Sequence, residues 1–120
     1  MEKKKILAID DSISQLTTYQ GILSSQYTFR AVKSASDALS FLNATLVDIV
    51  LLDIEMPNIS GFEFLNDIRK IPSYFQVPII IVSGHSDSEF LNRARNSSAA
   101  DVLTKPVRPE VLIETIDKYL

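Results

Sequence analysis

The sequence predicts an α/β protein in which a doubly wound, five-stranded parallel sheet carries five helices distributed over both faces. Apolar runs of strand length recur five times along the 120 residues, and a stretch with helical spacing of apolar residues follows each of them. The third and fourth runs are almost continuously apolar, which is typical of strands buried on both faces. Right-handed crossovers between such strands place helices on the two sides of the sheet.

The elements follow in a regular order along the chain. Strands are predicted at residues 6–9, 27–32, 49–52, 77–82 and 99–103, and helical spacing appears within residues 13–23, 38–42, 62–68, 90–94 and 111–116. Ser34 is placed to cap the second helix, and the segment from Ser86 to Glu89 resembles a capping box that opens the fourth.

Composition narrows the function classes. Hydrophobic residues make up 46% of the chain and charged residues 22%, with no linker or repeat, so residues 1–120 are expected to form one globular domain. The absence of cysteine favours a reducing compartment, and the cytoplasm is the expected location. A net charge of −3 without a basic patch, and the lack of a long apolar run, argue against direct binding to nucleic acid or to a membrane.

Polar side chains follow four of the five apolar runs at their carboxyl-terminal ends. In a doubly wound sheet the ligand site lies beyond these strand ends, so the side chains should meet at one edge. Taken singly, each also fits a turn, a cap or a surface charge, and it is their joint placement that favours a site. They are Asp10 and Asp11 after the first run, Asp53 after the third, Ser83 and Gly84 after the fourth, and Thr104, Lys105 and Pro106 after the fifth.

Three carboxylates gathered at a buried edge repel one another and call for a cation. Oxygen ligands suit Mg²⁺, with Mn²⁺ as the second choice. Beside such an ion, Asp53 is a candidate nucleophile for a phosphoryl group, and the product would be an aspartyl phosphate. Lys105 could neutralise one phosphoryl oxygen, the Ser83 hydroxyl could donate to another, and Gly84 leaves room for close approach.

This ordered set resembles the receiver domain of two-component response regulators over essentially the whole chain. The resemblance rests on Asp10-Asp11, the segment from Asp53 to Gly61, the pair Ser83-Gly84, and Lys105-Pro106, in that order. It implies the sheet order 2-1-3-4-5 of flavodoxin-like and chemotaxis-regulator folds, an order that the residues alone do not give.

The resemblance also implies roles. A histidine kinase or a histidine phosphotransfer domain would donate a phosphoryl group to Asp53, which would switch the conformation and change partner binding. Activity beyond metal-assisted self-phosphorylation and dephosphorylation is not expected, so the chain is not predicted to be an enzyme. The outer face of the fourth helix, fifth strand and fifth helix would signal to a downstream protein or an appended output domain, and homodimers occur in such domains.

Individual residues receive roles from the same resemblance. The metal ligands would be Asp10, Asp11, Asp53 and the backbone carbonyl of Glu55. Ser83 would be the switch hydroxyl, and Glu55 and His85 would flank the attacking water and tune the phosphate lifetime. Lys105 would sense the phosphate, with a cis peptide bond to Pro106, while Pro57, Gly61 and Gly84 would shape the loops.

One departure from the family pattern concerns the switch. An aromatic residue is common three positions before the lysine, where this chain has Val102. Since valine cannot swing between two rotamers as an aromatic ring does, we expect activation to depend more on the loop after Ser83 and on the fourth helix.

Three other functions are compatible with parts of the same residue pattern. A flavin carrier of this architecture would need a neutral, hydroxyl-rich loop after the first strand, where Asp10 and Asp11 stand. An aspartyl phosphatase fits Glu55, two residues after Asp53, but needs lid segments for which the chain lacks length. A degenerate receiver that binds a protein partner without phosphorylation stays as the alternative, because its fold and surface would be the same. The residues are compatible with a free-standing regulator, a phosphorelay intermediate or an excised amino-terminal domain of a longer protein.

Overall fold

The structure is a computed structural model that describes residues 2–57 and 59–120. Strand and helix alternate five times, as the sequence predicts, and a short 3₁₀ helix precedes the fourth strand. Among these residues no helix has the length and apolar character that a bilayer crossing requires. The elements are β1 (Lys5–Ile9), α1 (Ile13–Leu23), β2 (Thr28–Val32), α2 (Ala35–Ala44), β3 (Ile49–Asp53), α3 (Gly61–Arg69), η1 (Pro72–Tyr74), β4 (Ile79–Ser83), α4 (Ser88–Arg95), β5 (Asp101–Thr104) and α5 (Pro109–Tyr119).

All strand pairs are parallel, and the sheet order is β2-β1-β3-β4-β5. The doubly wound fold and the order 2-1-3-4-5 are therefore confirmed. Every residue of β3 and β4 is buried, whereas the edge strands β2 and β5 are partly exposed. This difference explains why the two central strands have the most continuous apolar sequences.

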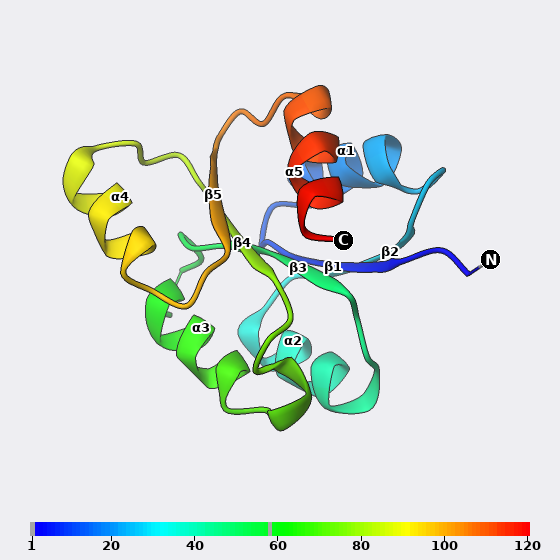
Figure 1. The fold of residues 1–120 in the computed structure, drawn as a ribbon, viewed down its shortest axis with the longest axis horizontal. Helices are drawn as coiled ribbons and strands as arrows, with labels where there is room; N and C mark the ends of the chain where they lie inside the picture. The colour runs from blue at the N-terminus through cyan, green and yellow to red at the C-terminus, as the bar shows by residue number, and fades with distance from the viewer. Residues whose placement is uncertain (1, 58) are drawn as a thin grey trace.

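The helices form two layers around the sheet (Figure 1). Helices α1 and α5 pack on one face, and α2, α3 and α4 supply the core of the other. Successive side chains of β1 alternate between these two cores. Leu7 and Ile9 enter the core beneath α2, α3 and α4, and Ile6 and Ala8 enter the core beneath α1 and α5. The sheet is thus held from both sides, and its carboxyl edge has a fixed shape.

Side chains cap four of the helices at their amino ends. Ser34 accepts a hydrogen bond from Asp37 N at 3.1 Å, so the predicted cap of α2 is confirmed. The predicted capping box of α4 is wrong: Asp87, and not Ser86, accepts from Phe90 N at 3.1 Å. An aspartate carboxylate caps at least as well as a serine hydroxyl, so the helix begins one residue later.

Strand boundaries differ from the sequence prediction by one or two residues. The apolar run at 77–82 becomes a strand at Ile79–Ser83. Pro78 has no N–H to donate, although its carbonyl accepts from Val50 N at 3.0 Å. Apolar character marks burial rather than ladder hydrogen bonds, so the prediction placed the start of this strand too early.

Gly61 is required by a close approach at the start of α3. A Cβ atom at this position would lie 2.5 Å from the backbone oxygen of Ile54 and 2.5 Å from two of its side-chain carbons. Ile54 follows β3 directly, so this contact fixes the loop that carries Glu55. By contrast, a Cβ at Gly21, within α1, would meet nothing within 4 Å.

Gly61→Ala is expected to lower the free energy of unfolding by about 1–3 kcal/mol, because the loop backbone must move. Gly21→Ala is the matched control and is expected to raise it by up to about 1 kcal/mol through helix propensity. Urea denaturation followed by circular dichroism measures both. If the two substitutions changed the free energy of unfolding equally, the close approach of Gly61 to Ile54 would be contradicted.

Candidate functional site

Four strand ends bring their polar side chains to one edge of the sheet, as the sequence predicts. Asp10 follows β1, Asp53 ends β3, and Ser83 ends β4. Ser83 lies opposite Thr104 in the parallel register, and the N–H of Lys105 donates to the Ser83 carbonyl at 2.7 Å. The backbone therefore fixes where each of these side chains begins.

Burial separates these residues from ordinary turn residues. Tyrosines apart, the buried polar or charged side chains of the described residues are Asp10, Asp53 and Ser83, with exposed fractions of 0%, 4% and 0%. All three lie at this edge. Because burying a charge without a partner is costly, the edge must supply partners for the two carboxylates.

A cluster of carboxylates has the donor set of a metal site. Asp10, Asp11 and Asp53 each offer one oxygen, and these oxygens lie within 4.8 Å of one another. Asp11 is exposed, so water can reach the cluster from its side. Hard oxygen ligands with open water positions fit Mg²⁺ or Mn²⁺, and the residues present therefore fit the ion that the resemblance implies. The ligand role of the Glu55 carbonyl stays a prediction.

Lys105 is the positive charge among the buried carboxylates. Its Nζ lies 3.3 Å from Asp10 Oδ2 and 3.5 Å from Asp53 Oδ2. The other oxygen of each carboxylate is held by backbone: Asp10 Oδ1 accepts from Ser12 N at 2.9 Å, and Asp53 Oδ1 accepts from Glu55 N at 3.0 Å. The Lys105–Pro106 peptide bond is cis, as the resemblance implies.

Burial and charge act in opposite directions on these groups. Burial is the largest effect on Asp53 and, together with the Asp10 charge, raises the pKa of its carboxyl above the ordinary 3.8. The hydrogen bond from Glu55 N–H and the charge of Lys105 act in the opposite direction but do not cancel the increase. Burial also disfavours the ammonium of Lys105, but attraction to Asp53 and Asp10 outweighs it and raises the pKa of Lys105. The lysine thus stays charged, and Asp53 carries a net penalty for being ionised.

The side chain of Glu55 occupies a place that sequence reasoning did not foresee. Its Oε1 accepts hydrogen bonds from the Ser83 hydroxyl and, at 2.6 Å, from Gly84 N–H. First the Ser83 bond and then the Gly84 bond lower the pKa of the Glu55 carboxyl. Gly84 was expected to leave room for close approach, and a Cβ there would meet Glu55 carboxylate oxygens at 3.6 and 3.9 Å, which is ordinary contact. The feature of the sequence that could have pointed to this contact is the position of Glu55 two residues after Asp53.

His85 extends the same group of contacts toward α4. Its Nε2 lies 3.8 Å from Glu55 Oε2, and its backbone N–H donates to Ser83 Oγ at 3.0 Å. The imidazole ring is exposed, with its centroid 5.9 Å from that of Phe90. The structure therefore places His85 at the rim of the site, beside the start of α4. Pro57 is exposed in the turn after β3.

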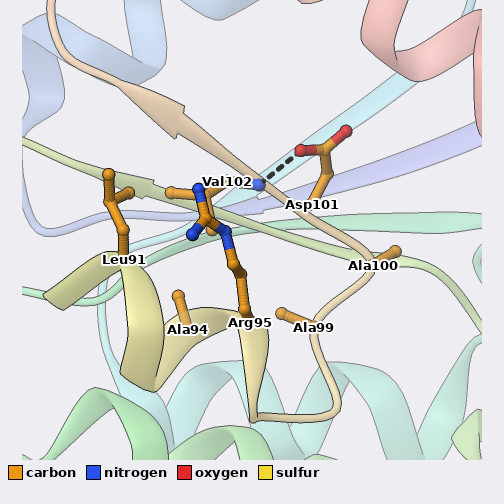
Figure 2. Close-up of a pocket in the computed structure, with 7 residues that line it drawn as sticks. All are labelled: Leu91, Ala94, Arg95, Ala99, Ala100, Asp101 and Val102. Atoms are coloured by element: carbon orange, nitrogen blue, oxygen red, sulfur yellow. Dashed lines mark hydrogen bonds between the residues drawn. The ribbon is translucent and has the colours of Figure 1, made fainter. Parts of the chain in front are cut away.

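Val102 lies away from these residues, in a groove of about 310 Å³ between α4 and β5. Figure 2 shows the Arg95 side chain running from α4 toward Val102. The groove is lined by Leu91, Ala94, Arg95, Ala99, Ala100, Asp101 and Val102. The small side chain of Val102 provides no ring that could fill this space.

Asp53→Asn is expected to raise the free energy of unfolding of the metal-free protein at pH 7, because the folded wild type must keep a buried carboxylate ionised beside Asp10. The folded wild type binds the Asp53 proton more tightly than the unfolded chain, so it loses stability as the pH rises from 3.8 through the raised pKa. The variant lacks this titration. Denaturant unfolding of both proteins in EDTA, from acid to neutral pH, measures the difference.

The stability difference should close as the pH falls below 3.8, where the Asp53 side chain is neutral in both the folded and the unfolded wild type. Asp67→Asn, on the exposed surface of α3, serves as the control and should leave stability within about 0.5 kcal/mol of wild type. If Asp53→Asn were less stable than wild type at neutral pH, repulsion between the buried carboxylates would not be a net cost to folding.

Comparison with curated proteins places this arrangement among known signalling proteins. The family model of the response regulator receiver domain matches residues 6–117. The two-component response regulator ORR5 of Oryza sativa subsp. japonica is 35% identical over 106 residues, covering 87% of this chain and 79% of that protein. A probable cyclic di-GMP phosphodiesterase of Vibrio cholerae is 33% identical over 115 residues, covering 96% of this chain but 26% of that protein.

Comparison with solved structures gives the same result. The chemotaxis protein CheY4 of Vibrio cholerae superposes with a TM-score of 0.92 at 28% identity, and the match covers 98% of this chain and 99% of that chain. A CheY-like receiver domain protein from Methanospirillum hungatei gives a TM-score of 0.88 at 27% identity, covering 98% and 93%. The chain therefore belongs to the response regulator receiver domain family of two-component signal transduction.

Proposed function

We propose that Asp53 is the phosphoacceptor of this receiver domain and that residues 1–120 act as one unit. The observation that carries the proposal is the ring of groups around the Asp53 carboxylate. It is buried at the end of β3, within reach of two further carboxylates and 3.5 Å from the Lys105 ammonium. A carboxylate so placed is largely shielded from bulk water.

The transfer step is a displacement at phosphorus. An oxygen of Asp53 attacks the phosphorus of a phosphohistidine on the donor protein, so an O–P bond forms as the N–P bond breaks. The electron pair of that bond stays on the imidazole nitrogen, which takes a proton from solvent. Dephosphorylation ends the signal. Water attacks the phosphorus, the Asp53 carboxylate leaves, and inorganic phosphate and a proton are released.

The chain's own residues orient and neutralise the phosphoryl group. Lys105 Nζ lies 3.5 Å from Asp53 Oδ2, and its flexible side chain could move the ammonium to an oxygen of a phosphoryl group on Asp53. The Ser83 hydroxyl and Gly84 N–H are donors suited to another oxygen. A bound Mg²⁺ or Mn²⁺, held by Asp10, Asp11, Asp53 and the Glu55 carbonyl, would supply Lewis-acid charge neutralisation.

We propose a histidine kinase or histidine phosphotransfer domain as donor, and a downstream protein or appended output domain as receiver of the signal. The face formed by α4, β5 and α5 would carry the signal and could support a homodimer. Beyond self-phosphorylation and dephosphorylation, no reaction is proposed. The proposed location is the cytoplasm, whose reducing conditions suit a chain without cysteine.

Incubation with acetyl phosphate and Mg²⁺ is expected to add one phosphoryl group to the protein, measured by intact-protein mass spectrometry. Asp53→Asn should abolish the adduct, because the acceptor oxygen is lost. Asp67→Asn removes a negative charge from an exposed position, and this variant should still form the phosphoryl adduct. An adduct on Asp53→Asn would place the phosphoryl group on another residue and contradict the proposal. No adduct on wild type, with either acetyl phosphate or a phosphohistidine donor, would favour the phosphorylation-independent binding module.

Mg²⁺ is expected to stabilise the folded protein, because the carboxylates come together only when the strands are paired. At a concentration 100 times its dissociation constant, a ligand that binds only the folded state adds about 2.7 kcal/mol. Thermal unfolding with and without MgCl₂ measures this gain. Asp11→Asn should reduce it strongly, since exposed Asp11 completes the cluster without contributing to the core, whereas Asp67→Asn should leave it intact.

A further inference from the structure

Two hydrogen-bond donors that a phosphoryl oxygen would need are already in use. The Ser83 hydroxyl and the Gly84 N–H, here called the donor pair, both point to Oε1 of Glu55. The backbone N–H of His85 donates to Ser83 Oγ at 3.0 Å, so the Ser83 hydroxyl is fixed in this orientation. The donor pair thus holds a carboxylate of the same chain.

The donor pair cannot serve Glu55 and a phosphoryl oxygen together at full strength. A hydroxyl has a single hydrogen to donate, and so does a backbone amide. Both acceptors are also anionic, and two anions on the same donors repel each other. Occupation by Glu55 and occupation by a phosphoryl group on Asp53 therefore compete.

We propose that the Glu55 carboxylate is an internal stand-in for the phosphoryl group, which holds the unphosphorylated domain in its resting state and must leave the donor pair upon phosphorylation. This inference concerns the regulation of the proposed phosphoacceptor and rests on that function. Glu55 can leave because its side chain is 38% exposed and belongs to the turn after β3 rather than to the sheet. Ser83 and Asp53, in contrast, are fixed in strands.

The departure of Glu55 would be transmitted to α4 through aromatic contacts. Glu55 Oε2 lies 3.8 Å from His85 Nε2, and the His85 ring lies 5.9 Å from Phe90. Phe90 in turn packs against Phe62 at 5.9 Å, and the Arg93 guanidinium lies 4.3 Å from the Phe62 centroid. A signal that leaves Ser83 thus has a path along the first turns of α3 and α4.

This path takes the place of the aromatic side chain that is common at position 102 in receiver domains and that Val102 lacks. Val102 lies in the groove between α4 and β5, and no aromatic ring is available there to follow the movement of Ser83. Among residues 2–57 and 59–120, the Glu55 carboxylate and the ring of His85 connect the donor pair with α4. Displacement of Glu55 therefore couples phosphorylation to α4 through the ring of His85.

The first arm of the experiment uses the metal-free protein without any phosphodonor. In Glu55→Ala the Gly84 amide loses its hydrogen bond to a carboxylate, so its proton resonance should move upfield relative to wild type in ¹H–¹⁵N spectra. Glu89→Ala is the matched control: it removes the same charge from the nearby first turn of α4, without a contact to the donor pair. It should leave the Gly84 resonance in place. An unchanged Gly84 resonance in Glu55→Ala overturns the proposal.

The second arm adds beryllofluoride, a tetrahedral phosphoryl mimic, with Mg²⁺. Glu55→Ala should bind it about tenfold more tightly than wild type, the factor that one hydrogen bond to a charged group is worth. Glu55→Gln keeps the shape but not the charge, and should fall between the two. The amides of Phe90 and Arg93 should shift in metal-free Glu55→Ala in the direction that beryllofluoride produces in wild type.

The two arms separate failure of this inference from failure of the phosphoacceptor function. If beryllofluoride binds Glu55→Ala and Glu89→Ala equally, or if Glu55→Ala binds it more weakly than wild type, Glu55 is not a competitor and the inference is wrong. If neither wild type nor any variant binds beryllofluoride while the Gly84 resonance still depends on Glu55, the phosphoacceptor function fails, and the regulation proposed for it fails with it. The internal contact between Glu55 and the donor pair would then stand by itself.

Discussion

Asp10 and Asp53 are carboxylates that share one ammonium group, that of Lys105, at the end of a sheet whose central strand β3 is apolar up to Asp53. Burial costs each charge its hydration, and the two charges repel each other. The fold offsets this cost with one lysine, two backbone N–H groups and an opening to water at Asp11. Any cation that enters the cluster is therefore drawn by a deficit of positive charge that folding itself creates.

The parallel sheet and the loops contribute differently to this site. Strands β1, β3 and β4 are held between two layers of helices, so Asp53 and Ser83 cannot move without disturbing the cores. Glu55 and His85 lie on turns beyond the strand ends and are exposed, so their side chains can change partners at little cost. The buried groups of the site therefore have fixed positions, whereas the exposed groups beside them can exchange partners.

Several features of the fold and the site were predictable from local sequence. Apolar runs of strand length are separated by amphipathic helices, and this alternation identifies a doubly wound sheet. Since strand ends of such a sheet meet at one edge, Asp53 and Lys105 could be brought together without coordinates. Local detail was less predictable: Asp87 rather than Ser86 caps α4, and Pro78 delays the start of β4, because apolar character reports burial and not hydrogen bonding.

The sequence by itself determined the fold class, the set of polar groups at the strand ends and the resemblance to receiver domains, because these depend on periodicity and on the order of residues along the chain. The tertiary structure alone decided which group contacts which. Glu55 stands two residues after Asp53 in the chain, yet its carboxylate binds Ser83 and Gly84, donors at the end of the neighbouring strand. A contact of this kind depends on side-chain direction, strand register and competition among donors, and these are fixed only when the sheet is assembled.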